Sequence, residues 1–141
     1  MSDTIVDSSV VAKWILPEPD SAHAQRLISE VALQGKRLIC LDLVFPEVAN
    51  AIWKRVHRGL ATTEESRQFL ADLVTSPVDV EPAISLLQPA LEIAVKYDRA
   101  VYDALFVALC HNLGLPGVTA DEPLFNVVHV DFPQITLLRN W

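Results

Sequence analysis

Residues 4–16, TIVDSSVVAKWIL, join a short apolar run to an amphipathic segment through one acid and two serines. The run TIV is rich in β-branched side chains, which favours a β-strand that ends at Asp7. Either Ser8 or Ser9 can cap the helix predicted over the following SVVAKWIL, and Pro17 ends that helix. A strand that passes through an acid directly into a helix is typical of the first unit of an α/β fold.

The same alternation of short apolar runs and helical segments continues along the chain. Strands are predicted at residues 4–7, 37–41, 78–80 and 117–120, with residues 127–130 as the candidate for a fifth. Helices are predicted at residues 9–16, 20–34, 44–59, 84–97 and 101–113, and one more starts at Thr62, which has capping-box spacing to Glu65. This alternation predicts an α/β fold with a mainly parallel sheet covered on both faces. A length of 141 residues fits a single domain over residues 1–141.

Composition and charge exclude several classes of protein. No apolar run approaches the roughly 18 residues of a membrane span and no signal peptide is visible, so we expect a cytoplasmic protein without a membrane anchor. Cys40 and Cys110 lie in separate apolar runs without a CxxC partner, which predicts buried free thiols and no zinc site. The net charge of −7 argues against a non-specific nucleic-acid binder. It does not exclude a nuclease, because carboxylates that bind a metal are themselves negative.

Four acids in the chain have apolar neighbours, and we call them the acidic quartet: Asp7, Glu47, Asp103 and Asp121. A carboxylate at the edge of a buried run is unfavourable unless something compensates its charge, and one divalent cation can compensate several. Asp7 and Asp121 are expected at the carboxyl ends of parallel strands, where open α/β sheets form their sites. Each acid taken alone is explained equally well as a helix cap or half of an ion pair. The pattern of residues by itself therefore leaves both interpretations open.

Four segments of the chain, in register, resemble the PIN-domain ribonucleases. They are VDSSVVAKWILPE at 6–18, PEVANAIWK at 46–54, VYDALFVAL at 101–109 and VTADEPL at 118–124. They are most similar to the VapC-type toxins of bacterial and archaeal toxin–antitoxin pairs. The resemblance implies a three-layer α/β/α domain with a four- or five-stranded sheet. It also implies an endoribonuclease that depends on Mg²⁺ or Mn²⁺ and leaves a 3′-hydroxyl and a 5′-phosphate.

The resemblance assigns roles to particular residues of this chain. Asp7 and Asp103 would be the principal metal ligands, and the other two members of the quartet, Glu47 and Asp121, would complete the site. Supporting hydrogen bonds are implied for three more residues: Ser9, Asn50 and Thr119. Asn50 lies one helical turn beyond Glu47 and is expected to orient it.

The chain departs from the family pattern after Asp121, where the family often continues with a basic residue and a longer helix. Here the sequence reads EPLFNVV, so the helix is expected to be short or absent. The resemblance also implies an antitoxin partner, whose basic tail would enter the acidic site, and a homodimer.

The sequence alone leaves functions of other classes open. A PIN fold that binds RNA or protein without cleaving it is the first, and the intact quartet argues against it. A receiver or phosphatase domain would also use a strand-end Asp, but Ser9 stands where the phosphatase carries a second Asp. Five cations could form a basic rim for RNA, although a solvated helix end is the favoured interpretation: Lys13, Lys54, Arg55, Arg58 and Arg99.

Overall fold

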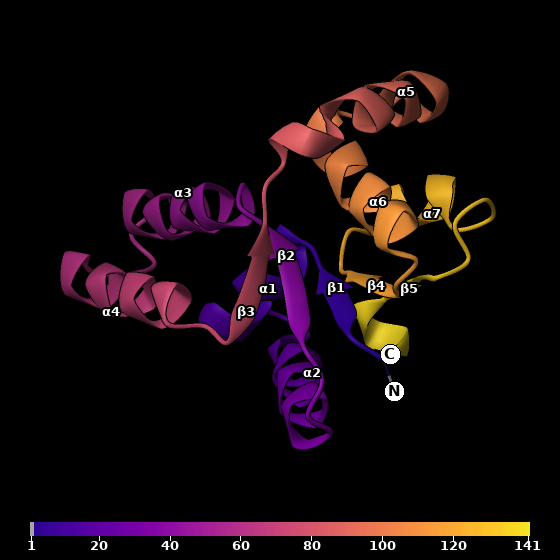
Figure 1. Ribbon diagram of the computed structural model, residues 1–141. Helices are drawn as coiled ribbons and strands as arrows, with labels where there is room; N and C mark the ends of the chain where they lie inside the picture. The colour runs from indigo at the N-terminus through magenta and orange to yellow at the C-terminus, as the bar shows by residue number, and fades with distance from the viewer. Residues whose placement is uncertain (1) are drawn as a thin grey trace.

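Five parallel strands form one sheet in the computed structural model, which describes residues 2–141. The strands lie in the order β3-β2-β1-β4-β5, and every neighbouring pair is parallel (Figure 1). Their bounds are Thr4–Val6 for β1, Leu38–Leu41 for β2, Val78–Glu81 for β3, Gly117–Thr119 for β4 and Ile135–Leu137 for β5. The first strand is therefore the central one, and Asp7 directly follows its carboxyl end.

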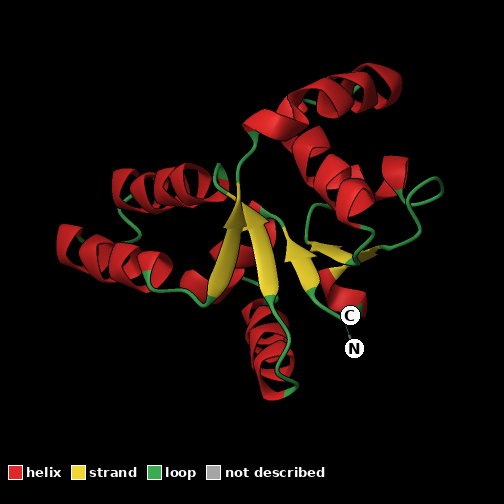
Figure 2. Ribbon diagram, in the orientation of Figure 1, coloured by secondary structure: helices red, strands yellow, loops and turns green. Residues whose placement is uncertain are grey.

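Helices cover both faces of this sheet and give three layers, α/β/α (Figure 2). The helices between β1 and β3 are α1 (Ser8–Ile15), α2 (Ser21–Leu33), α3 (Val44–His57) and α4 (Thr63–Val74). The later ones are η1 (Ile84–Leu86), α5 (Leu87–Tyr97), α6 (Val101–Leu113), α7 (Glu122–Val128) and η2 (Leu138–Asn140). Right-handed crossovers put α1–α4 on one face and α5–α7 on the other, because the chain reverses its direction across the sheet after β3. The predicted fold class is confirmed.

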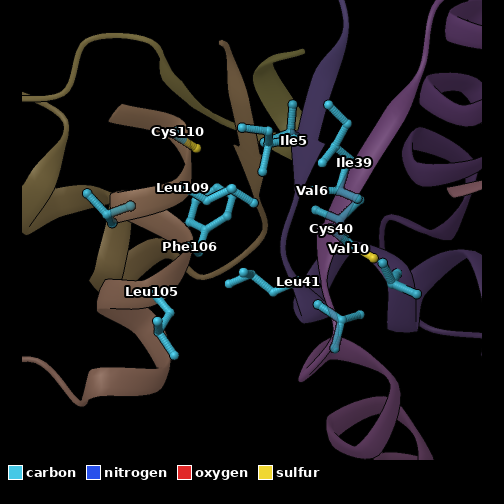
Figure 3. Close-up of a cluster of buried hydrophobic side chains, with 14 of the residues drawn as sticks. Ile5, Val6, Val10, Ile39, Cys40, Leu41, Leu105, Phe106, Leu109 and Cys110 are labelled. Atoms are coloured by element: carbon cyan, nitrogen blue, oxygen red, sulfur yellow. The ribbon is translucent and has the colours of Figure 1, made fainter. Parts of the chain in front are cut away.

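The hydrophobic core lies on both faces of the sheet, and one part of it fills the space between α6 and the central strands. Helix α6 packs against β1 and β2, and all of its residues from 104 to 110 are buried. Figure 3 shows Phe106 and Leu109 on the side of the strands that carries Ile5, while Val10 of α1 lies on the other side. Burial all round explains why α6 is apolar on every face. None of the helices in residues 2–141 combines the length and the apolar character that crossing a bilayer requires.

The fifth strand is not where the sequence predicted it. Residues 127 and 128 are the last two residues of the short helix α7, residues 129 and 130 form the turn after it, and the fifth strand is Ile135–Leu137. Helix α7 forms because the Asp121 carboxylate accepts the backbone N–H of Leu124, and because Leu124 and Val128 then lie one turn apart on the buried side. An apolar run of this length does not distinguish a strand from one helical turn. The expectation of a short helix after Asp121 is confirmed.

The cap of α1 also differs from the prediction. Asp7, rather than Ser8 or Ser9, is the N-cap, and its carboxylate accepts the backbone N–H of Val10. The same residue therefore ends the central strand and starts the first helix. The capping box of Thr62 and Glu65 at the start of α4 is confirmed, with both reciprocal hydrogen bonds present.

Gly117 lets α6 approach β4 closely. A Cβ at this position would overlap the Cys110 sulfur and would lie 2.9 Å from Cζ of Phe106. Both of these side chains belong to α6, whose first turn carries Asp103, and β4 leads to Asp121. The absence of a side chain at residue 117 thus sets the spacing between two elements that carry acids.

We predict that Gly117→Ala destabilises the protein by about 1–3 kcal/mol, because the added methyl group overpacks a closed core. Urea unfolding followed by circular dichroism measures the change. Combining it with Cys110→Ala removes one of the two clashes, so the double variant should be more stable than the sum of the single changes predicts. Strict additivity would show that the contact with Cys110 does not limit this packing.

Candidate active site

The acidic quartet comes from four separate places that the fold brings to one edge of the sheet. Asp7 follows β1 and Asp121 follows β4, while Glu47 and Asp103 lie in the first turns of α3 and α6. The carboxyl ends of parallel strands and the starts of the helices that follow them share this edge. Three members of the quartet line one pocket, together with apolar side chains of β1, β2 and α6: Asp7, Glu47 and Asp103. The pocket has an interior volume of about 20 Å³, enough for one water molecule or a small ion.

Two hydroxyl groups orient the Asp7 carboxylate. Ser9 Oγ donates a hydrogen bond to Oδ1, and Thr119 Oγ1 donates to Oδ2 over 2.5 Å. Each hydroxyl in turn accepts a backbone N–H of the β4–α7 connection, Ser9 from Ala120 at 2.9 Å and Thr119 from Asp121 at 3.0 Å. Each hydroxyl thus accepts one backbone N–H and donates its proton to the Asp7 carboxylate. The contacts are those expected of residues that support Asp7.

Burial, and to a lesser extent the negative charges of their neighbours, raises the pKa values of two members of the quartet. Burial raises the pKa of Asp7 from 3.8 to about 6, against the hydrogen bonds of Ser9 and Thr119, and the Asp121 charge adds to the rise. Glu47 lies exposed at the mouth of the pocket, yet its pKa is raised from 4.5 to about 7. The largest cause is desolvation of the Glu47 carboxylate by the protein around it, and the negative charges of Asp7 and Asp103 add to the rise. The charges of Asp7, Glu47 and Asp103 therefore influence one another.

Arg99 neutralises the other side of the quartet. Its Nη2 lies 3.0 Å from Oδ2 of Asp103 and 3.6 Å from Oδ2 of Asp121. The sequence had placed Arg99 only in a basic rim, and the structure shows it paired inside the acidic site. The spacing of four residues between Arg99 and Asp103 was a weak signal, because Arg99 precedes α6 and the helical i,i+4 rule does not apply to it.

The remaining candidates from the sequence lie elsewhere. Asn50 is exposed on α3, and the described residues contain no hydrogen bond between it and Glu47. Lys13 and Arg55 both pair with Glu18, so the basic rim does not form as a free cationic surface. Lys54 and Arg58, which are exposed at the end of α3, fit the favoured interpretation of a solvated helix end, whereas Lys13, Arg55 and Arg99 pair with acids instead.

The quartet has the donor chemistry of a magnesium or manganese site. Both ions prefer carboxylate oxygens and water. Over residues 2–141, however, no group of three or more His, Cys, Asp or Glu side chains is arranged to hold a metal ion. Asp103 and Asp121 instead face Arg99, and Asp7 faces its two hydroxyl donors. The residues fit a divalent cation by chemistry and location, with two of the acids turned toward an internal cation.

The comparison with known families agrees with this geometry. Residues 4–130 match the PIN domain family, which is most of the chain and includes every member of the quartet. The chain belongs to the PIN-domain family.

This PIN domain is similar to a curated ribonuclease and to solved structures of the same fold. Ribonuclease VapC3 of Pyrobaculum aerophilum is 35% identical over 122 residues, which cover 85% of this chain and 90% of that protein. The crystal structure of PAE2754 from the same organism is 26% identical, with a TM-score of 0.69, over 89% of this chain and 78% of that one. A toxin–antitoxin complex from Klebsiella pneumoniae shares the fold at 12% identity, with a TM-score of 0.61, over 96% of this chain and 98% of that one.

The raised pKa values predict how stability depends on pH in the metal-free protein. Asp7 and Glu47 bind protons at higher pH in the folded protein than in the unfolded chain. Their proton binding therefore contributes fully to the stability of the folded state below about pH 4. It is lost as the pH rises through about 6 and 7. Asp7→Asn keeps a cap for α1 but cannot ionise. Its stability relative to wild type should therefore increase by roughly 2–3 kcal/mol between pH 4 and pH 7.

Urea unfolding in EDTA at a series of pH values measures this difference. Asp3→Asn is the matched control, because hydrogen bonds from Arg37 lower the pKa of Asp3. Its stability relative to wild type should change in the opposite direction as the pH rises. If Asp7→Asn and wild type respond identically to pH, burial of the Asp7 charge is not what shapes this site.

Proposed function

We propose that this PIN domain is a divalent-metal-dependent endoribonuclease, the toxin of a type II toxin–antitoxin pair. The observation that carries the proposal is the meeting of the acidic quartet at one sheet edge, where burial and, secondarily, neighbouring carboxylates raise two pKa values. Family membership and the similarity to ribonuclease VapC3 support RNA as the substrate. The molecule would act in the cytoplasm.

The quartet would hold Mg²⁺ or Mn²⁺, with Asp7 and Asp103 as principal ligands and Glu47 and Asp121 completing the site. Such an ion supplies a water of lowered pKa and neutralises charge on a phosphoryl group. Ser9 and Thr119 keep both oxygens of Asp7 in a fixed orientation. Glu47, at the mouth of the pocket, is placed to hold a proton near neutral pH.

No covalent nucleophile is required by this reaction. Cys40 and Cys110 are both buried, and burial raises the pKa of Cys40 to about 12 and that of Cys110 further still. Neither thiol ionises near neutral pH, and the thiolate is the nucleophilic form. The carboxylates are therefore the groups through which this chain would act on a phosphodiester.

An antitoxin partner follows from the same proposal. The toxin–antitoxin complex from Klebsiella pneumoniae has this fold. A basic tail on such a partner could pair with the quartet, since charge-assisted hydrogen bonds to carboxylates are strong. The net charge of −7 favours a cationic partner. Homodimerisation belongs to the proposal as well.

We predict that the protein, freed of any partner, cleaves RNA in Mn²⁺ or Mg²⁺ and that EDTA abolishes the cleavage. Asp7→Asn and Asp103→Asn should each lower the rate by on the order of 100-fold or more, because each removes a metal ligand. Fragment analysis of total RNA on sequencing gels measures the rate and locates the cuts.

Asp79→Asn is the matched control for the loss of one carboxylate. Asp79 lies on the edge strand β3, exposed and paired with Arg37, away from the quartet. This variant should cleave at the wild-type rate. Wild-type protein that binds RNA but cleaves nothing would contradict the proposal and favour a PIN fold retained for binding alone.

A further inference from the structure

The chain itself carries a cation at one side of its acidic site, beside Asp103 and Asp121. Arg99 lies in the tight connection between α5 and α6, directly after Asp98, whose left-handed conformation (φ 53°) ends α5. The backbone N–H of Arg99 donates to Ala94 at 3.1 Å, which fixes where the side chain starts. The side chain is only 25% exposed. Its position is set by local structure rather than by a mobile loop.

Arg99 uses acid oxygens that a metal ion would need. Oδ2 of Asp103 accepts from Arg99 at 3.0 Å, and Oδ2 of Asp121 faces the same nitrogen at 3.6 Å. The other oxygen of Asp121, Oδ1, already accepts the N–H of Leu124 as the cap of α7. Both oxygens of Asp121 therefore already face a positive charge or an N–H donor, so a metal ion at that carboxylate would lie beside the Arg99 guanidinium.

The grip of Arg99 on the two acids is incomplete. Both contacts use one terminal nitrogen, Nη2, instead of the two-nitrogen fork that makes arginine–carboxylate pairs strong. Its Nε is buried and has no hydrogen-bond partner among residues 2–141. An unsatisfied buried donor is unfavourable, which reduces what the pairing contributes. Such a pair can be exchanged for a stronger ligand of the same carboxylates.

We propose that Arg99 is an internal counter-ion that holds Asp103 and Asp121 in the metal-free protein and competes with the divalent cation for them. This inference rests on the proposed function, since it concerns the same site. Its physical basis is that two cations at one carboxylate pair repel each other and share the same oxygens. Arg99 thus stabilises the empty quartet and weakens metal binding.

A purely structural ion pair makes a different prediction. Removing Arg99 would then lower the stability equally with and without metal, and metal affinity would stay the same. Competition instead couples the two effects: loss of Arg99 destabilises the metal-free protein and strengthens binding of the metal.

The test is calorimetric titration of Mn²⁺ into partner-free wild-type protein, Arg99→Met and Arg139→Met. Arg139 is the matched control, because it forms a two-nitrogen pair with Glu122, at 3.0 and 3.1 Å, next in sequence to Asp121. Both variants remove one positive charge near the site. Arg99→Met should bind Mn²⁺ about tenfold more tightly than wild type, whereas Arg139→Met should bind as wild type does.

Thermal unfolding with and without Mn²⁺ gives a second readout. The rise in melting temperature on adding Mn²⁺ should be larger for Arg99→Met than for wild type. Arg99→Lys keeps the positive charge on a shorter side chain, so its rise in melting temperature should fall between those of wild type and Arg99→Met. It replaces Arg99→Met in the test if that variant does not fold. Equal Mn²⁺ affinity in wild type and both Arg99 variants overturns the role of Arg99 alone. Folded wild-type protein that binds no Mn²⁺ overturns the proposed function and this inference with it.

Discussion

The Asp7 carboxylate, held between the hydroxyls of Ser9 and Thr119, is the contact on which the rest of the site depends. It joins the central strand β1 to the start of α1 and to the connection after β4, which are distant in sequence. The two hydroxyls accept the backbone N–H groups of residues 120 and 121 and donate their own protons to the part-buried Asp7 carboxylate. Burial nevertheless dominates, because the pKa of Asp7 stays raised, at about 6. A carboxylate that is firmly oriented yet incompletely stabilised is suited to a ligand that brings positive charge.

The quartet resolves its charge in two ways. On one side, proton uptake by Asp7 and Glu47 relieves the repulsion. On the other, Arg99 supplies a cation to Asp103 and Asp121. A divalent cation would replace both arrangements, by displacing protons and by displacing the guanidinium. In the folded, metal-free protein, protons and the Arg99 guanidinium thus compensate the charges that a metal ion would compensate.

Much of the fold was predictable because single segments carried strong signals. The apolar run of α6 and the strand before Asp7 were found from their patterns, since burial on all sides demands apolar residues throughout. Residues 127–130 were misassigned because the Asp121 cap and the burial of one helical face, not the apolar run, decide their conformation. The ionic partners of Arg99 were missed because Arg99 lies before the start of α6, outside the reach of helical spacing rules, and because its contact with Asp121 depends on the placement of β4 beside β1. Asn50 was assigned by resemblance, and no hydrogen bond joins it to Glu47 among the described residues.

The central claim is that these carboxylates bind a divalent cation, and proton release on binding tests it most directly. Mn²⁺ titrations at pH 6.5 in two buffers of different ionisation enthalpy give the number of protons released per ion. With pKa values of about 6 for Asp7 and about 7 for Glu47, the account predicts release of about one proton at pH 6.5 and almost none at pH 8.5. Binding without proton release at pH 6.5, or no binding at either pH, would contradict it.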